Sequence, residues 1–316
     1  MGFKKILGGA AAFLLALSLA VCLFPQPALA YTRIETGRET SLTIQYGDGE
    51  RISGVSFSLY RVAEVSETVR FTLTGEFSDY RVSLEDLDSG DWRDLAETLA
   101  AYAARDRLSP LKTGETNREG RLVFSNLKTG LYLVVGERSR DGRYTYEPEP
   151  FLICLPNLSP SGLWQYNAEA APKYEKDRRP SHGDDDTRDL RVRKVWEDDG
   201  AAGRPSKIEV QLLRNGRVYD TVTLSRRNNW RHTWYDLDRD DRWQVVEKWT
   251  PEGYTVSVNR EGTTYLMTNT RTGRPPAPNP PEEHLPQTGQ LWWPVAPLAL
   301  AGMVLFGIGW QLERRR

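Results

Sequence analysis

The chain has 316 residues, enough for two ordinary domains of about 100–150 residues each. Its formal net charge is −1, which gives no argument for a nucleic-acid partner. Of the two cysteines, one lies in an apolar N-terminal stretch, so a disulfide framework is excluded for the rest of the chain. The three histidines are accompanied by no nucleophile motif or metal-ligand spacing, so we expect neither an enzyme nor a cofactor or metal site.

Residues 1–30 have the pattern of a secretory signal peptide. Two lysines precede a long apolar run, and a small-x-small triplet ends at Ala30, where we expect cleavage. The alternative is a lipoprotein signal ending at Cys22, but the bulky Val21 directly before that cysteine disfavours it. The sequence therefore predicts a secreted protein.

Residues 31–173 are predicted to form a β-sandwich domain with one inserted helix. Six runs have the character of short strands, at 41–46, 54–62, 69–74, 121–124, 130–135 and 151–155. The segment 91–107 is instead expected to be a helix capped by Ser89 or Asp91. Its apolar residues recur at helical spacing, so one face should pack on the sheet; they are Trp92, Leu95, Leu99 and Tyr102.

Four stretches of this domain resemble the N-terminal domain of Gram-positive pilins. They are Gly54-x-x-Phe57-x-Leu59-Tyr60-Arg61-Val62, Gly130 to Val135, Pro150 to Ile153, and Trp164 to Lys173. The resemblance implies that Lys173 accepts the sortase-bound threonine of another pilin subunit. Ala170-Ala171 stand where the pilin motif usually has Val-Tyr, so an ordinary solvated lysine is the alternative.

Residues 174–187 are expected to be a linker and residues 188–270 a second domain. Short alternating runs separated by turn signals predict an antiparallel sandwich of immunoglobulin-like design. The expected strands are 190–196, 207–213, 218–224, 230–237, 243–249, 254–258 and 264–270. The fold class is thus mainly β, with two tandem sandwiches.

Strand parity selects three polar residues in this second domain. Side chains alternate between the two faces of a strand, and this places Lys194, Glu247 and Asn269 each on an otherwise apolar face. In the fifth run that face extends to Trp249. Because a lone buried charge is costly, we expect the three polar side chains to meet.

The same segment resembles a Cna B-type domain of Gram-positive adhesins and pilins. The matching motifs are Lys-Val-Trp at 194–196, the box from Trp243 to Tyr254, and Thr268-Asn269-Thr270. The resemblance implies a spontaneous isopeptide bond in which Lys194 is the nucleophile, Asn269 the acyl donor and Glu247 the proton shuttle. Burial should lower the pKa of the lysine and raise that of the glutamate. A buried salt bridge with Asn269 as a hydrogen-bond partner is the alternative.

Two further patterns are interpreted as structural. In the first domain, Tyr46 and Gly136 occupy the positions of the lysine and the glutamate, so no isopeptide bond is expected there. In the second, the run Asp236-x-Asp238-x-Asp240 imitates a calcium loop, but its sixth position holds Asp241 instead of the required glycine. We interpret this run as an acidic turn.

The C-terminal segment has three parts in a fixed order. A proline-rich spacer at 271–284 favours an extended polyproline conformation. A run at 291–310 is uncharged and long enough to span a bilayer, and three arginines end the sorting segment 285–316. The pentapeptide between spacer and span consists of Leu285, Pro286, Gln287, Thr288 and Gly289.

This arrangement resembles that of sortase substrates. The resemblance implies that a sortase cleaves after Thr288 and transfers it to an amine of peptidoglycan. We therefore expect a secreted, wall-anchored structural protein of a Gram-positive bacterium, a minor or basal pilin. Its partners would be sortase, peptidoglycan and other pilin subunits, with the membrane contacted only through the sorting-signal helix before cleavage. The alternative is a monomeric adhesin whose outer domain binds a host or bacterial ligand.

Overall fold

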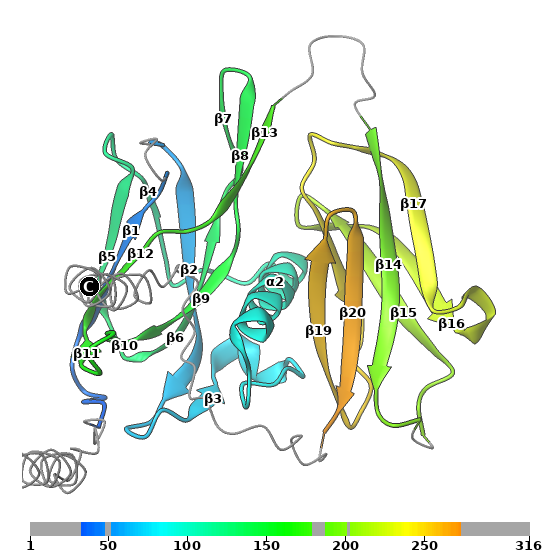
Figure 1. Ribbon diagram of the computed structural model, residues 1–316, viewed down its shortest axis with the longest axis horizontal. Helices are drawn as coiled ribbons and strands as arrows, with labels where there is room; N and C mark the ends of the chain where they lie inside the picture. Colours follow the sequence, from blue (N-terminus) through cyan, green and yellow to red (C-terminus); the bar gives the residue numbers. More distant parts are fainter. Residues whose placement is uncertain (1–32, 48–51, 179–186, 201–202, 273–316) are drawn as a thin grey trace, which may run out of the picture.

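The computed structural model describes residues 33–47, 52–178, 187–200 and 203–272. Within them the chain is mainly β, and its single α-helix is α2 (Ser89–Asp106) (Figure 1). Two 3₁₀ turns are also present, η1 (Gly75–Asp79) and η2 (Arg226–Asn228). Residues 33–178 are called the N-terminal region below, and residues 187–272 the C-terminal region. No helix in these described ranges has the length and apolar character needed to cross a bilayer.

The C-terminal region is a sandwich of two sheets, with strand orders β17-β14-β20-β19 and β16-β15-β18. All seven predicted runs are strands: β14 (Thr187–Glu197), β15 (Lys207–Arg214), β16 (Arg217–Ser225), β17 (Arg231–Asp238), β18 (Trp243–Glu247), β19 (Tyr254–Glu261) and β20 (Thr264–Arg271). Several boundaries differ from the prediction, and one of the differences moves an expected core residue to the surface. β18 ends at Glu247, and Trp249, expected on the buried face, is 75% exposed. The chain leaves the sheet there because the turn ahead of β19 begins at Lys248.

In the N-terminal region the main sheets have the orders β12-β1-β5 and β3-β2-β6-β9, and β4 also pairs with β2. The six predicted runs correspond to β1 (Thr40–Gln45), β2 (Ser56–Val65), β3 (Phe71–Leu73), β5 (Arg121–Leu127), β6 (Gly130–Gly136) and β9 (Phe151–Leu155). The strands not predicted are β4 (Lys112–Glu115), β7 (Ser139–Asp141), β8 (Tyr144–Pro148), β10 (Asn157–Leu158), β11 (Trp164–Gln165), β12 (Asn167–Ala170) and β13 (Tyr174–Arg178). Most of these are short and polar, so they lack the apolar alternation that identifies a strand.

Residues 174–178, expected to belong to the linker, form β13. This strand pairs antiparallel with β8, with Tyr174 opposite Pro148 and Arg178 opposite Tyr144. The sheet structure of the N-terminal region therefore continues past residue 173. The expected strand runs could not show this, because β13 is almost entirely exposed and charged.

Helix α2 begins at Ser89, and its N-cap precedes both predicted caps. Asp88 is the N-cap, and its side chain accepts hydrogen bonds from the backbone N–H groups of Gly90 and Asp91. The Asp91 carboxylate in turn accepts from the Asp88 N–H at 3.0 Å, which completes a capping box. Asp91 thus stabilises the helix from the third position, and neither Ser89 nor Asp91 is the cap that the sequence predicted.

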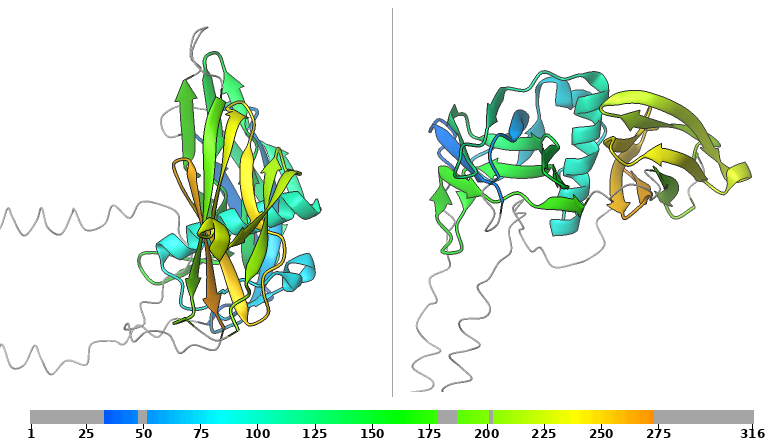
Figure 2. Two further views of the ribbon diagram at one scale, coloured as in Figure 1. Left: turned by 90° about the vertical axis from the view of Figure 1, so that its right-hand side faces the viewer. Right: turned by 90° about the horizontal axis from the view of Figure 1, so that it is seen from above.

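The apolar stripe of α2 is buried, as predicted, but it has two partners. The helix lies between the sheet that contains β6 and β9 and the β19 edge of the C-terminal region (Figures 1 and 2). Trp92, Leu95 and Leu99 belong to one hydrophobic cluster with core residues of the C-terminal region such as Val245 and Val258. The two regions therefore share a continuous core through this helix.

Edge strand β19 is covered by the N-terminal region. The Val258 N–H donates to Thr98 Oγ1 at 2.8 Å, and the Val256 N–H donates to the carbonyl of Arg81 at 3.0 Å. Unpaired N–H groups at a sheet edge would otherwise face water or another chain. The contact between the regions is therefore part of the hydrogen-bonded structure of the second sandwich.

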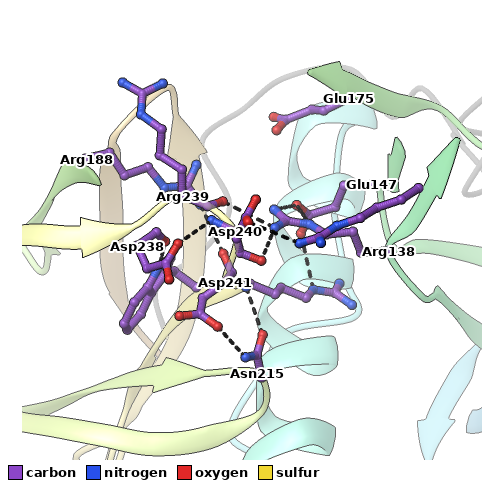
Figure 3. Close-up of polar contacts among 12 residues, drawn as sticks. Arg138, Glu147, Glu175, Arg188, Asn215, Asp238, Arg239, Asp240 and Asp241 are labelled. Atoms are coloured by element: carbon purple, nitrogen blue, oxygen red, sulfur yellow. Dashed lines mark hydrogen bonds and ion pairs between the residues drawn. The ribbon is translucent and has the colours of Figure 1, made fainter. Parts of the chain in front are cut away.

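A charged cluster extends this contact around the acidic turn at 238–241 (Figure 3). Arg138 of the N-terminal region donates to the carbonyl groups of Arg239 and Asp240, at 3.3 and 2.7 Å. Arg138 also pairs with Glu147, and Arg242 reaches the same carboxylate at 3.5 Å. The aspartate turn is thus used as an interface element.

Candidate functional site

Lys194 is the polar member of the apolar face of β14. Only 4% of the residue is exposed, although lysine is among the residues least often buried. Its Nζ donates to the carbonyl groups of Val195 and Met267, at 2.9 and 3.2 Å, and lies 4.5 Å from the ring centroid of Trp196. These contacts hold the amine inside the sandwich, and no carboxylate among the described residues accepts a hydrogen bond from it.

Glu247 and Asn269 are fully buried and in contact with each other. The Asn269 Nδ2 donates to both carboxylate oxygens of Glu247, at 3.1 and 3.0 Å. Among the described residues, the Asn269 Oδ1 is buried without a hydrogen-bond partner. A buried carbonyl oxygen without a hydrogen-bond partner is unusual. Here it is the oxygen of the side-chain amide whose carbon atom a nucleophile would attack.

The elements bring the three side chains to one place between the two sheets. β14 and β20 are parallel neighbours in one sheet, with Lys194 opposite Met267 and Trp196 opposite Asn269. β18 belongs to the facing sheet and ends at Glu247. The structure brings the three polar residues to one place: Asn269 is hydrogen-bonded to Glu247, and the charge of Glu247 acts on Lys194.

Burial shifts both titrating groups toward their neutral forms. The pKa of Lys194 is lowered because its ammonium is desolvated, and the Glu247 charge opposes this shift only in part. The pKa of Glu247 is raised because burial outweighs the stabilising effects of Lys194, Asn269 and the Thr250 hydroxyl. The site therefore favours a neutral amine beside a protonated carboxyl group, the combination needed for attack on an amide.

Sequence patterns did not identify the residues that surround Glu247. The Tyr102 hydroxyl donates to the Glu247 carbonyl at 3.3 Å and lies 3.3 Å from Thr250 Oγ1. Arg105 donates to the carbonyl groups of Glu247 and Lys248, each at 3.3 Å. Tyr102 and Arg105 lie on α2, far away in the sequence, so no local pattern could connect them with the site.

The corresponding positions of the N-terminal region have a different composition. Tyr46 is fully buried, and its ring lies edge-on to those of Phe57 and Tyr174, at 5.4 and 5.3 Å. A side chain at Gly136 would come within 2.6–2.7 Å of Pro148 and Phe57. Aromatic packing thus fills the space where the C-terminal region has its lysine and carboxylate.

The remaining predicted residues lie at the surface or outside the described ranges. Lys173 is exposed, and its carbonyl accepts a hydrogen bond from the Glu149 N–H. The cleavage position Ala30 and the sorting signal at 285–289 lie outside the described residues. Within those described, no group of three or more His, Cys, Asp or Glu side chains is placed to hold a metal ion.

Comparison with protein families identifies the segment that contains the site. Residues 190–270 match the family described as Cna protein B-type domain. The resemblance drawn from the motifs around Lys194, Glu247 and Asn269 is therefore confirmed for this segment. The chain is mainly β, with a sandwich of the Cna B type that carries the buried Lys–Glu–Asn cluster.

Similar proteins come from the surfaces of Gram-positive bacteria. The chain is 28% identical over 160 residues to a collagen adhesin of Staphylococcus aureus, a match that covers 40% of this chain and 14% of the adhesin. A single B repeat unit of the collagen-binding surface protein of S. aureus aligns with 74% of this chain and 100% of its own, at 18% identity and a TM-score of 0.26. The major pilin SpaD of Corynebacterium diphtheriae aligns with 75% of this chain and 99% of its own, at 13% identity and a TM-score of 0.27.

Proposed function

We propose that this chain is a structural protein of a Gram-positive cell surface whose C-terminal region closes itself with an isopeptide bond between Lys194 and Asn269. The observation that carries the proposal is the buried cluster in which Asn269 contacts Glu247 while Lys194 lies among apolar neighbours. A buried ion pair alone contributes little to stability, because desolvation offsets the attraction between the charges. A covalent product would remove both the cost of the buried lysine charge and the free amide.

The reaction needs only the groups present. The neutral Lys194 Nζ attacks the Asn269 Cγ, and the new Nζ–Cγ bond replaces the Cγ–Nδ2 bond. Glu247 gives its proton to Nδ2, which leaves as ammonia, and recovers a proton from Nζ. Its carboxylate oxygens lie 3.0 and 3.1 Å from Nδ2, within reach for this transfer.

The position of the bond suits a protein under tension. It would join β14 to β20, the first and last strands of the C-terminal region, which are parallel neighbours. Pulling on the two ends of such a pair loads the hydrogen bonds between these strands. A covalent link at this place would carry the load in place of the hydrogen bonds between β14 and β20.

Attachment to the wall completes the proposal. Sortase would cleave between Thr288 and Gly289 and join Thr288 to peptidoglycan, after the signal peptide is removed at Ala30. The support is the order of spacer, pentapeptide, uncharged span and arginines in the sequence. The protein would then stand on the wall through the spacer at 271–284.

Intact-mass measurement tests the isopeptide bond. The soluble chain 31–284 should be lighter than its sequence mass by one ammonia. Lys194→Ala, Asn269→Ala and Glu247→Gln should each have the full sequence mass, because each removes a reacting or proton-transferring group. Lys207→Ala, an exposed lysine of the same region, is the matched control and should remain one ammonia light. A wild-type chain at its full sequence mass would exclude the bond.

A pilin subunit and a monomeric adhesin differ in the use of Lys173. We expect the pilin role through Lys173, which is exposed just before β13; Lys176 is also exposed and lies over the ring of Tyr144 at 4.6 Å. Incubation with a pilin-type sortase and a partner subunit should give covalent adducts that disappear in Lys173→Ala and persist in Lys176→Ala. Adducts that persist in Lys173→Ala, or never form, would favour an adhesin that binds its ligand through the N-terminal region.

A further inference from the structure

We propose that helix α2 of the N-terminal region positions Glu247 for the cross-linking reaction through Tyr102, Arg105 and Thr250, so that formation of the bond depends on docking of the two regions. The inference rests on the proposed isopeptide bond and adds to it Tyr102 and Arg105, which lie outside the Cna B-type segment. Tyr102 and Arg105 touch no reacting atom, so they are positioning residues.

A chain of hydroxyl groups connects α2 with the reacting amide. The Tyr102 hydroxyl lies 3.3 Å from Thr250 Oγ1, and the Thr250 hydroxyl is close enough to the Glu247 carboxyl group to lower its pKa. The same carboxyl group contacts Asn269 Nδ2. Tyr102 is 4% exposed, so this route is shielded from water.

Hydroxyl groups suit a carboxyl group that must change its protonation state. A hydroxyl both donates and accepts hydrogen bonds. When Glu247 is protonated, it can donate to Thr250, which donates to Tyr102, which donates back to the Glu247 carbonyl. When Glu247 is ionised, the Thr250 hydroxyl can turn and donate to it. The arrangement therefore serves both states of a proton shuttle without leaving a buried polar atom unpaired.

Arg105 fixes the backbone at the same point. Its guanidinium donates to the carbonyl groups of Glu247 and Lys248, where β18 ends and the chain turns. The guanidinium is itself held by Asp106 at 2.7 Å and lies 4.7 Å from the ring centroid of Tyr102. The ring of Tyr80 stacks on the ring of Tyr102, with their centroids 4.7 Å apart, and the Tyr80 hydroxyl donates to the Asp106 carboxylate at 2.7 Å. The positioning group is thus part of a rigid cluster of the N-terminal region.

Hydrogen bonds along the edge strand β19 fix the position of α2 on the C-terminal region. The hydrogen bonds from Val256 and Val258 of β19 to Arg81 and Thr98 fix the edge strand against the N-terminal region. Tyr102 lies one helical turn beyond Thr98 on the same side of α2. Correct docking of this edge therefore delivers Tyr102 to Thr250, and the bond would form in correctly assembled chains.

The rate of ammonia loss during refolding tests this inference. The chain 31–284 is dissolved in denaturant from inclusion bodies, confirmed by mass to be unreacted, and diluted into buffers across a pH series. Tyr102→Phe and Thr250→Val should lose ammonia about five- to tenfold more slowly than wild type, as expected for the loss of one hydrogen bond to a group in the reaction. Thr250→Ser retains the hydroxyl and should restore the wild-type rate.

Two controls separate positioning from docking and folding. Thr98→Val removes one hydrogen bond of the same interface without touching Glu247, and Tyr235→Phe alters a tyrosine that is 68% exposed. Both should retain the wild-type pH profile. In Thr250→Val the rate of ammonia loss should begin to fall at a higher pH than in wild type. The reason is that the lost hydroxyl had lowered the pKa of Glu247, which must be protonated to react.

The outcomes distinguish this inference from the proposed function. Wild-type rates and pH profiles in Tyr102→Phe and Thr250→Val would overturn the positioning role while leaving the bond intact. Equal slowing in Thr98→Val, with no change of pH profile in any variant, would overturn the positioning role of Tyr102 and Thr250 and leave only the dependence on docking. A wild-type chain that never loses ammonia would overturn the isopeptide bond itself, and this inference with it.

Discussion

Lys194 and Glu247 form a buried pair whose surroundings oppose the ionisation of both groups. Each group is desolvated more strongly than its partner can compensate, so the pKa of the lysine is lowered and that of the glutamate is raised. A surface pair of the same residues would stay ionised and would be unreactive. The difference arises from the apolar faces of β14 and β18, which surround the pair.

Glu97 is a second acid whose ionisation is opposed by its surroundings. It lies on α2 and lines a cavity of about 300 Å³ between the two regions. Burial raises its pKa to about 7, although Arg242 and Arg260 act in the opposite direction. The other charged groups that line the cavity are Arg93, Asp94, Glu147, Glu149, Glu175 and Glu261. Ionised Glu97 therefore adds a negative charge to a site already rich in carboxylates.

Replacement of Glu97 by glutamine should change the pH dependence of unfolding. The pKa of Glu97 in the folded state is raised above the ordinary value of 4.5 to about 7. Between these two pH values the folded state therefore binds more protons than the unfolded state. The stability that protonated Glu97 contributes is lost as the pH rises through this range. Glu97→Gln should therefore be about 1–2 kcal/mol more stable than wild type above pH 7. The advantage should vanish below pH 4.5.

Denaturant unfolding across this pH range measures the difference. Glu119→Gln, an exposed carboxylate of the N-terminal region, is the matched control and should leave the curve unchanged. Glu147 has the opposite sign, because Arg242 and Arg138 lower its pKa against the effect of burial. A Glu97→Gln effect that is constant with pH would contradict the expectation.

At the scale of the elements, α2 depends on its capping box as well as on its buried stripe. The first-turn N–H groups of a helix have no partner within the helix, and Asp88 satisfies two of them. Asp88→Ala should therefore lower the free energy of unfolding by about 1 kcal/mol. Because α2 joins the two regions, we expect them to unfold in a single transition. The loss of stability should therefore be the same whichever region the signal reports on.

Thermal or denaturant unfolding, followed by circular dichroism and tryptophan fluorescence, checks this expectation. Glu85→Ala, an exposed carboxylate just before the helix, serves as the control and should cost little. Equal stability of Asp88→Ala and Glu85→Ala would show that the box does not hold the helix.

In the whole molecule, the two regions are unequal in the load they would bear. If Lys173 accepts another subunit and Thr288 is joined to the wall, tension enters at Lys173 and leaves beyond β20. The force then runs through β13 and the C-terminal region and bypasses the strands before residue 173. This path agrees with the composition of the two sandwiches, because the position of Lys194 is occupied in the N-terminal region by the buried Tyr46, whose ring packs against that of Tyr174.

The local sequence pattern determined the seven strands of the C-terminal region, the buried stripe of α2 and the meeting of Lys194, Glu247 and Asn269. These features follow from alternation along a strand and periodicity along a helix, which depend only on neighbouring residues. The same pattern failed at Trp249, where parity was extended past the end of a strand. It also missed β13, whose exposed, charged residues show no alternation.

Tertiary structure alone decided what surrounds the site. Tyr102 and Glu247 are 145 residues apart in sequence, and their hydrogen bond exists only because α2 packs on the C-terminal region. The apolar stripe of a helix predicts that one face is buried, but it does not state against which partner. Lys194, Glu247 and Asn269 could therefore be selected from local pattern, whereas the groups that surround them depend on how the two regions dock.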